Sequence, residues 1–137
     1  MLTEIGIIQQ LVTTGFKKRL PDGLLISHFG VLNHLTRLGE GQAPHKIADA
    51  FQVSRASMSN TLDKLVKRQL IEERAHPRDG RSKLVYLTEK GTKARLAALE
   101  VLEPELIAMG EEVDLERISE ALPALVEIRE YLDKRRT

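Results

Sequence analysis

The order of elements expected between residues 44 and 91 is the feature that most constrains the fold of this chain. Pro44 is expected at the first position of a short helix, where its missing N–H costs nothing, and Phe51 is expected to be buried at the end of that helix. After a tight turn, Ser54 is a favourable N-cap for a second helix that reaches about residue 68. Two short helices joined in this way are typical of a helix-turn-helix.

The second of these helices has two distinct faces. Met58, Leu62 and Leu65 are spaced so that they share one side, which is expected to face a core. The opposite side of its first half is small and polar, with Ser54, Arg55, Ala56, Ser57, Ser59 and Asn60. The major groove of DNA accepts one α-helix, and its base edges pair with short polar side chains and forked donors. These residues are therefore candidate DNA contacts, with Asn60 suited to adenine and Lys64 suited to a phosphate.

A basic hairpin is predicted directly after this helix. Residues 70–74 and 83–87 have strand-favouring side chains and flank a turn at residues 76–80. The turn brings Arg78 and Arg81 together on a protruding loop, which suits the narrow minor groove of DNA. Each basic residue alone is more simply explained as part of a solvated face. The ordered combination of helix, turn, helix and basic hairpin instead favours a nucleic-acid surface.

The charge of the chain is nearly balanced but unevenly distributed. Lys and Arg number 21 against 20 Asp and Glu, so the net charge of +1 excludes a simple polybasic binder and a highly acidic mimic. Residues 54–90 carry 9 basic and 5 acidic groups, whereas residues 96–137 carry 5 and 11. This distribution indicates one face for polyanions, although ordinary surface scatter explains the charge alone equally well.

The residue content disfavours several functional classes. The chain has no cysteine, which excludes disulfides, thiolate metal sites and thiol redox switches, and it has no Gly-rich phosphate loop or nucleophile elbow. His28 and His34 are six residues apart and therefore lie on different faces of one helix, so no metal site is expected. We expect no catalytic residue, metal or cofactor. No apolar run reaches the ~20 residues of a membrane span, and the N-terminus lacks signal-peptide features, so a cytoplasmic protein without membrane contact is expected.

Long amphipathic helices are predicted on both sides of this central region. Apolar residues recur at helical spacing in three segments: Leu2, Ile5, Ile8, Leu11 and Val12; Leu99, Leu102, Leu106 and Met109; and Leu115, Ile118, Leu122 and Leu125. A further helix is expected over about residues 27–38, ended by Gly39. Pro123 is expected to kink or break the last helix, because proline removes a donor and clashes with the preceding turn.

The stretch from Val53 to Gly91 resembles the winged helix-turn-helix of the MarR family of bacterial transcription regulators. The resemblance is carried by VSRASMSNTLDKLVKRQLIEER and by HPRDGRSKLVYLTEKG, and LLISHFGVL matches the second helix of the family in spacing. The most specific pieces are Asp79-Gly80-Arg81 and the sequence LTEKG that follows. With the flanking helices in the same order, the resemblance covers nearly the whole chain.

The resemblance implies a mainly α fold with a small β wing, in which residues 1–137 form one domain. Residues 24–91 would form the DNA-binding region with a wing at 70–87, and residues 1–20 and 92–137 would intertwine with a second subunit. Such a homodimer would also bury the three apolar seams, which are too many for one thin helical layer. In this family the wing arginine, here Arg81, enters the minor groove, and the wing aspartate, here Asp79, pairs with basic groups to stiffen the hairpin.

Three residues depart from the family pattern. Gln69 stands where glycine is usual after the recognition helix, so that helix end is expected to differ locally. Asn60 stands where arginine is frequent, which changes the expected base contact. Leu25 replaces the usual threonine cap of the second helix.

A small-molecule effector pocket is a further implication, because the family binds small aromatic effectors beside the second helix. His28 and Phe29 are the candidate pocket residues, although a partly exposed helix histidine is the simpler interpretation of His28.

The function that these patterns favour is a sequence-specific regulator of transcription that binds double-stranded DNA. It would act as a homodimer, most often a repressor in this family, on a pseudo-palindromic operator, because two-fold symmetry places two recognition helices one DNA turn apart. The alternative is a winged-helix protein-interaction module or antirepressor without specific DNA binding. Salt-dependent binding to duplex DNA would distinguish the two.

Overall fold

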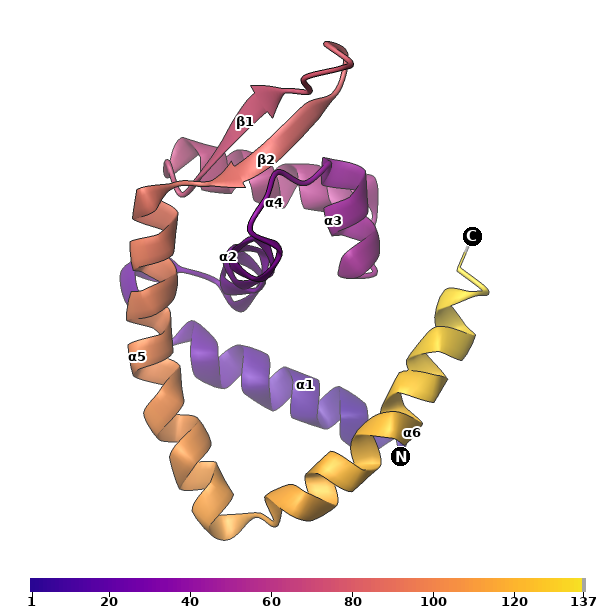
Figure 1. Cartoon of the computed structure of the whole chain (residues 1–137). Helices are drawn as coiled ribbons and strands as arrows, with labels where there is room; N and C mark the ends of the chain where they lie inside the picture. Colours follow the sequence, from indigo (N-terminus) through magenta and orange to yellow (C-terminus); the bar gives the residue numbers. More distant parts are fainter. Residues whose placement is uncertain (137) are drawn as a thin grey trace. The chain divides into compact units, whose positions relative to one another are not determined.

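The computed structural model describes residues 1–136, so only the last residue of the expected dimerisation segment lies outside it. Its elements follow in the order α1 (Leu2–Lys17), a short 3₁₀ helix η1 (Pro21–Gly23), α2 (Ile26–Leu38), α3 (Pro44–Ala50), α4 (Arg55–Lys67), β1 (Ile71–Ala75), β2 (Lys83–Leu87), α5 (Glu89–Glu112) and α6 (Leu115–Asp133) (Figure 1). The expected mainly α fold with a β wing is confirmed. The chain divides into two compact units, one ending at Leu102 and the other beginning at Glu103.

The core of the first unit forms around α2 and α4. Val31 and Leu32 of α2 are buried, as are Met58, Leu62 and Leu65 of α4, which confirms the face predicted for that helix. The helical spacing of these apolar side chains causes α4 to turn its opposite, polar face outward. Burial thus fixes the orientation of α4.

The prediction that Phe51 is buried is wrong. Phe51 is the C-cap residue that follows α3, and it is 37% exposed. Its ring lies edge-on to the ring of His34 on α2, with 5.4 Å between the centroids. Gly30 of α2 makes this approach possible, because a Cβ at that position would lie 3.3 Å from the Phe51 ring. Phe51 therefore packs on the outside of α2 and does not enter the core.

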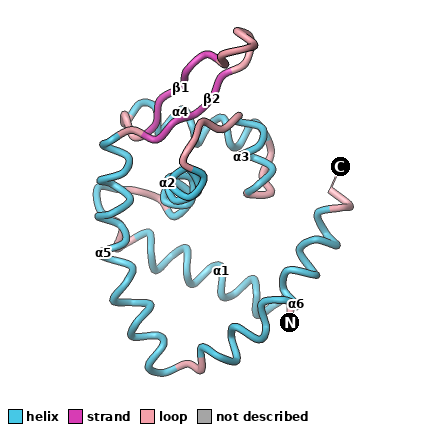
Figure 2. The backbone as a smooth tube through the Cα atoms, viewed as in Figure 1, coloured by secondary structure: helices cyan, strands magenta, loops and turns pink. Residues whose placement is uncertain are grey.

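The wing is an antiparallel hairpin in which Ile71 pairs with Leu87 and Ala75 with Lys83, and its loop stands at the far end (Figure 2). Gln42 and Val85 exchange two backbone hydrogen bonds of 2.8 and 3.1 Å, so the segment before α3 lies along the outer edge of β2. Tyr86 packs so closely on this segment that a Cβ on Gly41 would overlap its ring. The base of the wing is thereby fixed to the helical core.

The start of α2 shows how the chain replaces a missing cap. Leu25 has no side-chain acceptor, and the Nδ1 of His28 accepts its backbone N–H at 3.4 Å. The interpretation of His28 as a partly exposed residue is wrong, because only 5% of it is exposed. Burial first, and then the positive charges of Arg68 and Lys64, lower the pKa of His28 below its ordinary value of 6.5.

Helix α6 continues through Pro123 from Leu115 to Asp133, so the expected break does not occur. Its N-terminus is capped by Asp114, whose Oδ1 accepts the N–H groups of Glu116 and Arg117 at 3.0 and 3.2 Å. A proline removes one donor, and the remaining hydrogen bonds of a 19-residue helix are sufficient to keep it continuous.

Large apolar side chains remain exposed on the long helices. On α1 they are Leu2, Ile5, Ile7, Ile8, Leu11 and Val12, and from residue 103 onward they include Leu106, Ile107, Leu115, Ile118, Leu122 and Leu125. Leu11 and Leu122 are 66% and 57% exposed. Each of the two units therefore presents apolar surface that its own residues leave uncovered.

Candidate nucleic-acid interface

Helix α4 presents the predicted contact residues on an exposed face. Ser54 is the N-cap, and its Oγ accepts the backbone N–H of Ser57 at 3.0 Å, which fixes where the helix starts. The residues expected to contact DNA from this helix are exposed: Ser54, Arg55, Ala56, Ser57, Ser59, Asn60 and Lys64. Within residues 1–136, the side chains of Arg55, Asn60 and Lys64 make no hydrogen bond or ion pair, so their donors face solvent.

The wing loop presents Arg78 and Arg81, and both side chains are exposed. Asp79 holds the backbone between them: its Oδ1 accepts the N–H of Arg81 at 3.0 Å, and its Oδ2 accepts the hydroxyl of Ser82 at 3.1 Å. Asp79 therefore stiffens the loop through a backbone N–H and a hydroxyl, whereas the resemblance implied basic partners. The guanidinium of Arg81 remains available for an outside anion.

His76 is a wing residue that sequence reasoning missed. Its Nδ1 accepts the backbone N–H groups of Arg78 and Asp79, at 3.0 and 3.2 Å. A ring nitrogen in this position does what the carbonyl of an asparagine does in an Asx turn. The sequence did contain an indication of this role. His76 stands directly before the turn sequence Pro77-Arg78-Asp79-Gly80, and such turns are stabilised by a side-chain acceptor at their first residue.

A groove of about 320 Å³ lies between the start of α4 and the wing. Arg55 and Ser59 line it from α4, and Lys83 lines it from β2. His45 at the start of α3 completes the basic lining and was not among the predicted contacts. The Nζ of Lys83 is 3.4 Å from the carboxylate of Glu73 across the hairpin, which restrains that lysine.

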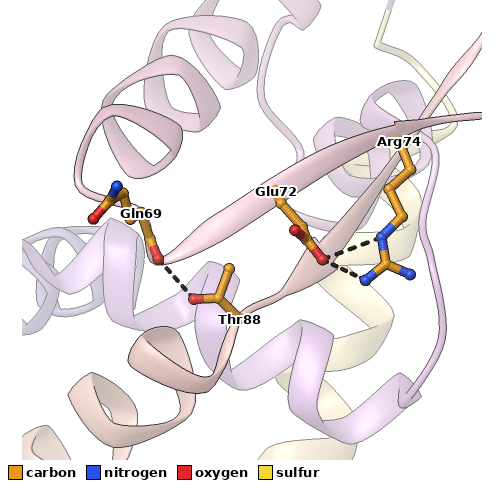
Figure 3. Close-up of polar contacts among 4 residues, drawn as sticks. All are labelled: Gln69, Glu72, Arg74 and Thr88. Carbon is orange, nitrogen blue, oxygen red and sulfur yellow. Dashed lines mark hydrogen bonds and ion pairs between the residues drawn. The ribbon is translucent and has the colours of Figure 1, made fainter.

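Arg81 lies in a different groove, of about 650 Å³, formed by β1, the wing loop and the end of α4. In this groove Arg74 pairs with the carboxylate of Glu72 (Figure 3), and its guanidinium lies 4.2 Å from the centroid of the Tyr86 ring. Arg55 and Ser59 therefore line one groove and Arg81 lines the other, whereas Ser82 and Lys83 line both. The candidate contacts of α4 and of the wing loop thus line two grooves that meet at Ser82 and Lys83.

The candidate effector residues His28 and Phe29 do not line either groove. Within residues 1–136, no three His, Cys, Asp or Glu side chains lie close enough together to hold a metal ion. None of the described helices is long and apolar enough to cross a membrane.

Comparison with known proteins supports the fold and shows which family part of the chain resembles. The model of the MarR family matches residues 22–82, which run from η1 to the wing loop. Over these residues the chain is similar to the MarR family. No curated protein matches it significantly.

Solved MarR-type structures match nearly the whole chain. The MepR–DNA complex of S. aureus is 20% identical with a TM-score of 0.83, and covers 95% of this chain and 96% of MepR. A mutant MarR of E. coli complexed with operator DNA is 20% identical with a TM-score of 0.81, covering 92% and 91%. PcaV of Streptomyces coelicolor in complex with its natural ligand is 15% identical with a TM-score of 0.81, covering 92% and 89%. At these identities the matches establish the fold.

The MarR-family glycine position after the recognition helix is occupied by Gln69, which adopts the left-handed conformation with φ of 61°. Gln69 is therefore accommodated in a conformation that glycine adopts more easily. The Gln69 carbonyl accepts the Thr88 hydroxyl at 2.7 Å, which helps to hold this conformation (Figure 3).

Proposed function

We propose that this chain is a transcription regulator that binds double-stranded DNA as a homodimer on a pseudo-palindromic operator. The observation that carries this proposal is the exposed polar face of α4, whose Arg55, Asn60 and Lys64 have no partner within residues 1–136, next to a wing loop that exposes Arg78 and Arg81. A helix with free donors on its N-terminal turns is what the major groove requires, and a projecting basic loop is what the minor groove requires.

The contacts have different roles in this proposal. Arg55 and Asn60 read base edges, since guanidinium and amide groups form bidentate pairs with guanine and adenine. Lys64 and Lys83 neutralise phosphates and set the position of the protein on the duplex. Arg81 enters the minor groove, with Asp79 holding the loop behind it. Residues 24–91 form the DNA-binding region in this assignment.

The dimer in this proposal forms through residues 1–20 and 92–137, within a single-domain subunit. The exposed apolar faces of α1 and of the helices after Leu102 support it, because a monomer would leave these faces in water. A two-fold dimer places its two recognition helices about 34 Å apart, one turn of DNA, which matches half-sites of a palindrome.

Regulation by a small molecule is part of the proposal, with the protein acting as a repressor that the effector releases. The match to PcaV solved with its natural ligand supports a ligand site on this fold. His28 and Phe29 of α2 are the proposed contacts, and the Nε2 of His28 is the ring atom for the effector because Nδ1 accepts the N–H of Leu25. An effector changes DNA binding only if it binds one arrangement of the two wings better than another.

Fluorescence anisotropy tests the proposal directly. The protein is titrated onto duplex DNA from the region upstream of its own gene, and onto a shuffled duplex of the same composition, at several salt concentrations. Tight, preferential binding with a steep salt dependence is expected. A folded dimer that binds neither duplex at any salt concentration would contradict it and would favour the protein-interaction module.

A further inference from the structure

The end of the recognition helix α4 is attached to the start of α5 through three consecutive backbone carbonyls. The carbonyl of Arg68 accepts the Nζ of Lys90 at 3.0 Å, and that of Gln69 accepts the Oγ1 of Thr88 at 2.7 Å. The carbonyl of Leu70 accepts the backbone N–H of Thr88 at 3.2 Å. We call residues 68–70 together with residues 88–91 the α4–α5 clamp; Figure 3 shows its Gln69–Thr88 contact.

The clamp is tight because α5 approaches the α4 end without a side chain between them. A Cβ at Gly91 would overlap the Leu70 carbonyl oxygen, so a larger residue would push the two elements apart. The Oγ1 of Thr88 also accepts the N–H of Gly91 at 2.9 Å, which caps α5 with the same hydroxyl that binds Gln69. The residues of LTEKG therefore serve the junction between the two helices.

The α4 side of the clamp is fixed as well. The guanidinium of Arg68 donates to the carbonyl of Asp22 at 2.9 Å, which attaches the same residue to the turn before α2. Gln69 adopts a left-handed conformation with φ of 61°, so this bend is held by its surroundings and not by the preference of the residue. A change at Lys90 or Thr88 thus acts on the direction of α4 relative to the start of α5.

We propose that Lys90 and Thr88 are positioning residues that set the direction of α4 relative to α5, and thereby the half-site spacing that the dimer accepts. This inference rests on the proposed function, in which α5 belongs to the dimerisation segment. Residues 89–102 of α5 lie in the same compact unit as α4, so a bond at the first turn of α5 acts on the angle at which this part of the helix meets α4. Neither residue needs to contact DNA for this role.

Lys90 is the better residue to change, because Thr88 also caps α5 and its loss would weaken the fold. Lys90→Met keeps the length of the side chain and removes the donor to Arg68, while Lys90→Arg retains a donor. Lys93→Met is the matched control. Lys93 lies one turn later on the same helix, and among residues 1–136 its one ion-pair partner is the exposed Glu89, at 3.4 Å. Lys90→Met and Lys93→Met remove the same charge.

The test measures binding to an operator selected in vitro with the wild-type protein, and to versions with one base pair added or removed between the half-sites. Lys90→Met is expected to reduce the preference for the selected spacing by about fivefold to tenfold, as the loss of one charged hydrogen bond allows. Lys90→Arg should restore the preference, and Lys93→Met should leave it at the wild-type value. A merely destabilised protein would bind all three duplexes less well and keep the same ratio.

Equal spacing preference in Lys90→Met and Lys93→Met would overturn the inference. If the wild-type protein binds no duplex at all, the proposed function has failed, and with it the spacing role of the clamp. Hydrogen exchange then distinguishes failure of the proposed function from failure of the clamp. If the clamp exists, the amides of residues 68–70 should exchange faster in Lys90→Met than in Lys93→Met. Unchanged exchange would overturn the clamp itself.

Discussion

The Nδ1 of His76 accepts the backbone N–H of Arg78 at 3.0 Å, so an imidazole holds the first basic residue of the wing loop in place. The same nitrogen accepts the N–H of Asp79 at 3.2 Å. With Asp79 accepting from Arg81 and Ser82, the loop is closed by side-chain acceptors at both ends. The arginines are thus presented on an ordered loop, which in the proposed function would lower the entropy lost on binding DNA.

Replacing His76 tests this arrangement. His76→Ala leaves two N–H groups without an acceptor and should loosen the loop, at a cost of about 1 kcal/mol in an exposed site. His76→Asn restores an acceptor at nearly the same place and serves as the control. Limited trypsin digestion at Arg78 and Arg81 should be several-fold faster in His76→Ala and near wild type in His76→Asn. Equal digestion of all three proteins would contradict the role.

Arg81→Ala should weaken operator binding and reduce the slope of log affinity against log salt by about 1, because one phosphate or minor-groove contact is lost. Anisotropy titrations at several salt concentrations measure both quantities. Lys93→Met, which also loses one positive charge but lies on α5, should leave the slope unchanged. An unchanged affinity in Arg81→Ala would exclude the wing contact.

Asn60→Ala should change the preferred base at one position per half-site by about 1–3 kcal/mol while leaving nonspecific affinity nearly unchanged. Selection from a random duplex library reports the preferred sequence. Lys64→Gln is the control for a phosphate contact. Its loss should lower the affinity for all duplexes alike and leave the preferred sequence unchanged. The same preferred sequence from Asn60→Ala and wild type would disprove base reading by this residue.

Gln69→Gly should stabilise the fold, since glycine adopts a φ of 61° without the penalty that other residues carry. The penalty of about 1 kcal/mol is partly offset by the greater freedom of glycine in the unfolded chain, so a gain of about 0.5 kcal/mol is expected. Gln69→Ala retains the penalty and should not be stabilised. Urea unfolding at a fixed protein concentration measures the difference, and a glycine variant less stable than the alanine variant would refute it.

Acidification should destabilise the protein through His28. Burial lowers the pKa of His28 in the folded state below the 6.5 of an unfolded chain, so the folded state favours the neutral ring. The stability that this ring contributes is present above pH 6.5 and is lost as the pH falls toward the folded-state pKa. His34, whose pKa is lowered by burial and then by Arg37, contributes in the same direction.

Unfolding by urea at about pH 7.5 and about pH 5 measures this loss. The loss should be smaller in His28→Gln than in wild type, because glutamine does not titrate and can still accept the N–H of Leu25. His34→Gln provides the comparison for a second shifted histidine. A pH dependence that is identical in wild type and both variants would contradict the assignment.

Local sequence signals predicted the framework of this fold. Pro44 at the start of a helix, Ser54 as an N-cap and Thr88 before α5 are each recognised by chemistry within a few residues, and the structure places all three as predicted. The buried face of α4 was equally readable, because its spacing reflects one helix packing against a core.

Features that depend on contacts between distant segments were not predicted. Phe51 was expected inside, but the space that Gly30 leaves on α2 determines where its ring lies. The burial of His28 depends on the packing around α2, and the partner of Lys90 is a carbonyl 22 residues earlier in the chain. Such positions carry no periodic signal, since tertiary packing alone brings the partners together.

The backbone bridge between Gln42 and Val85 has a consequence for association between molecules. A two-stranded hairpin has two open edges, each able to pair with a strand from another chain. The segment at Gln42 occupies the β2 edge, and the β1 edge carries the charged side chains of Glu72, Glu73 and Arg74. We therefore expect the wing to resist edge-to-edge pairing with strands of other chains.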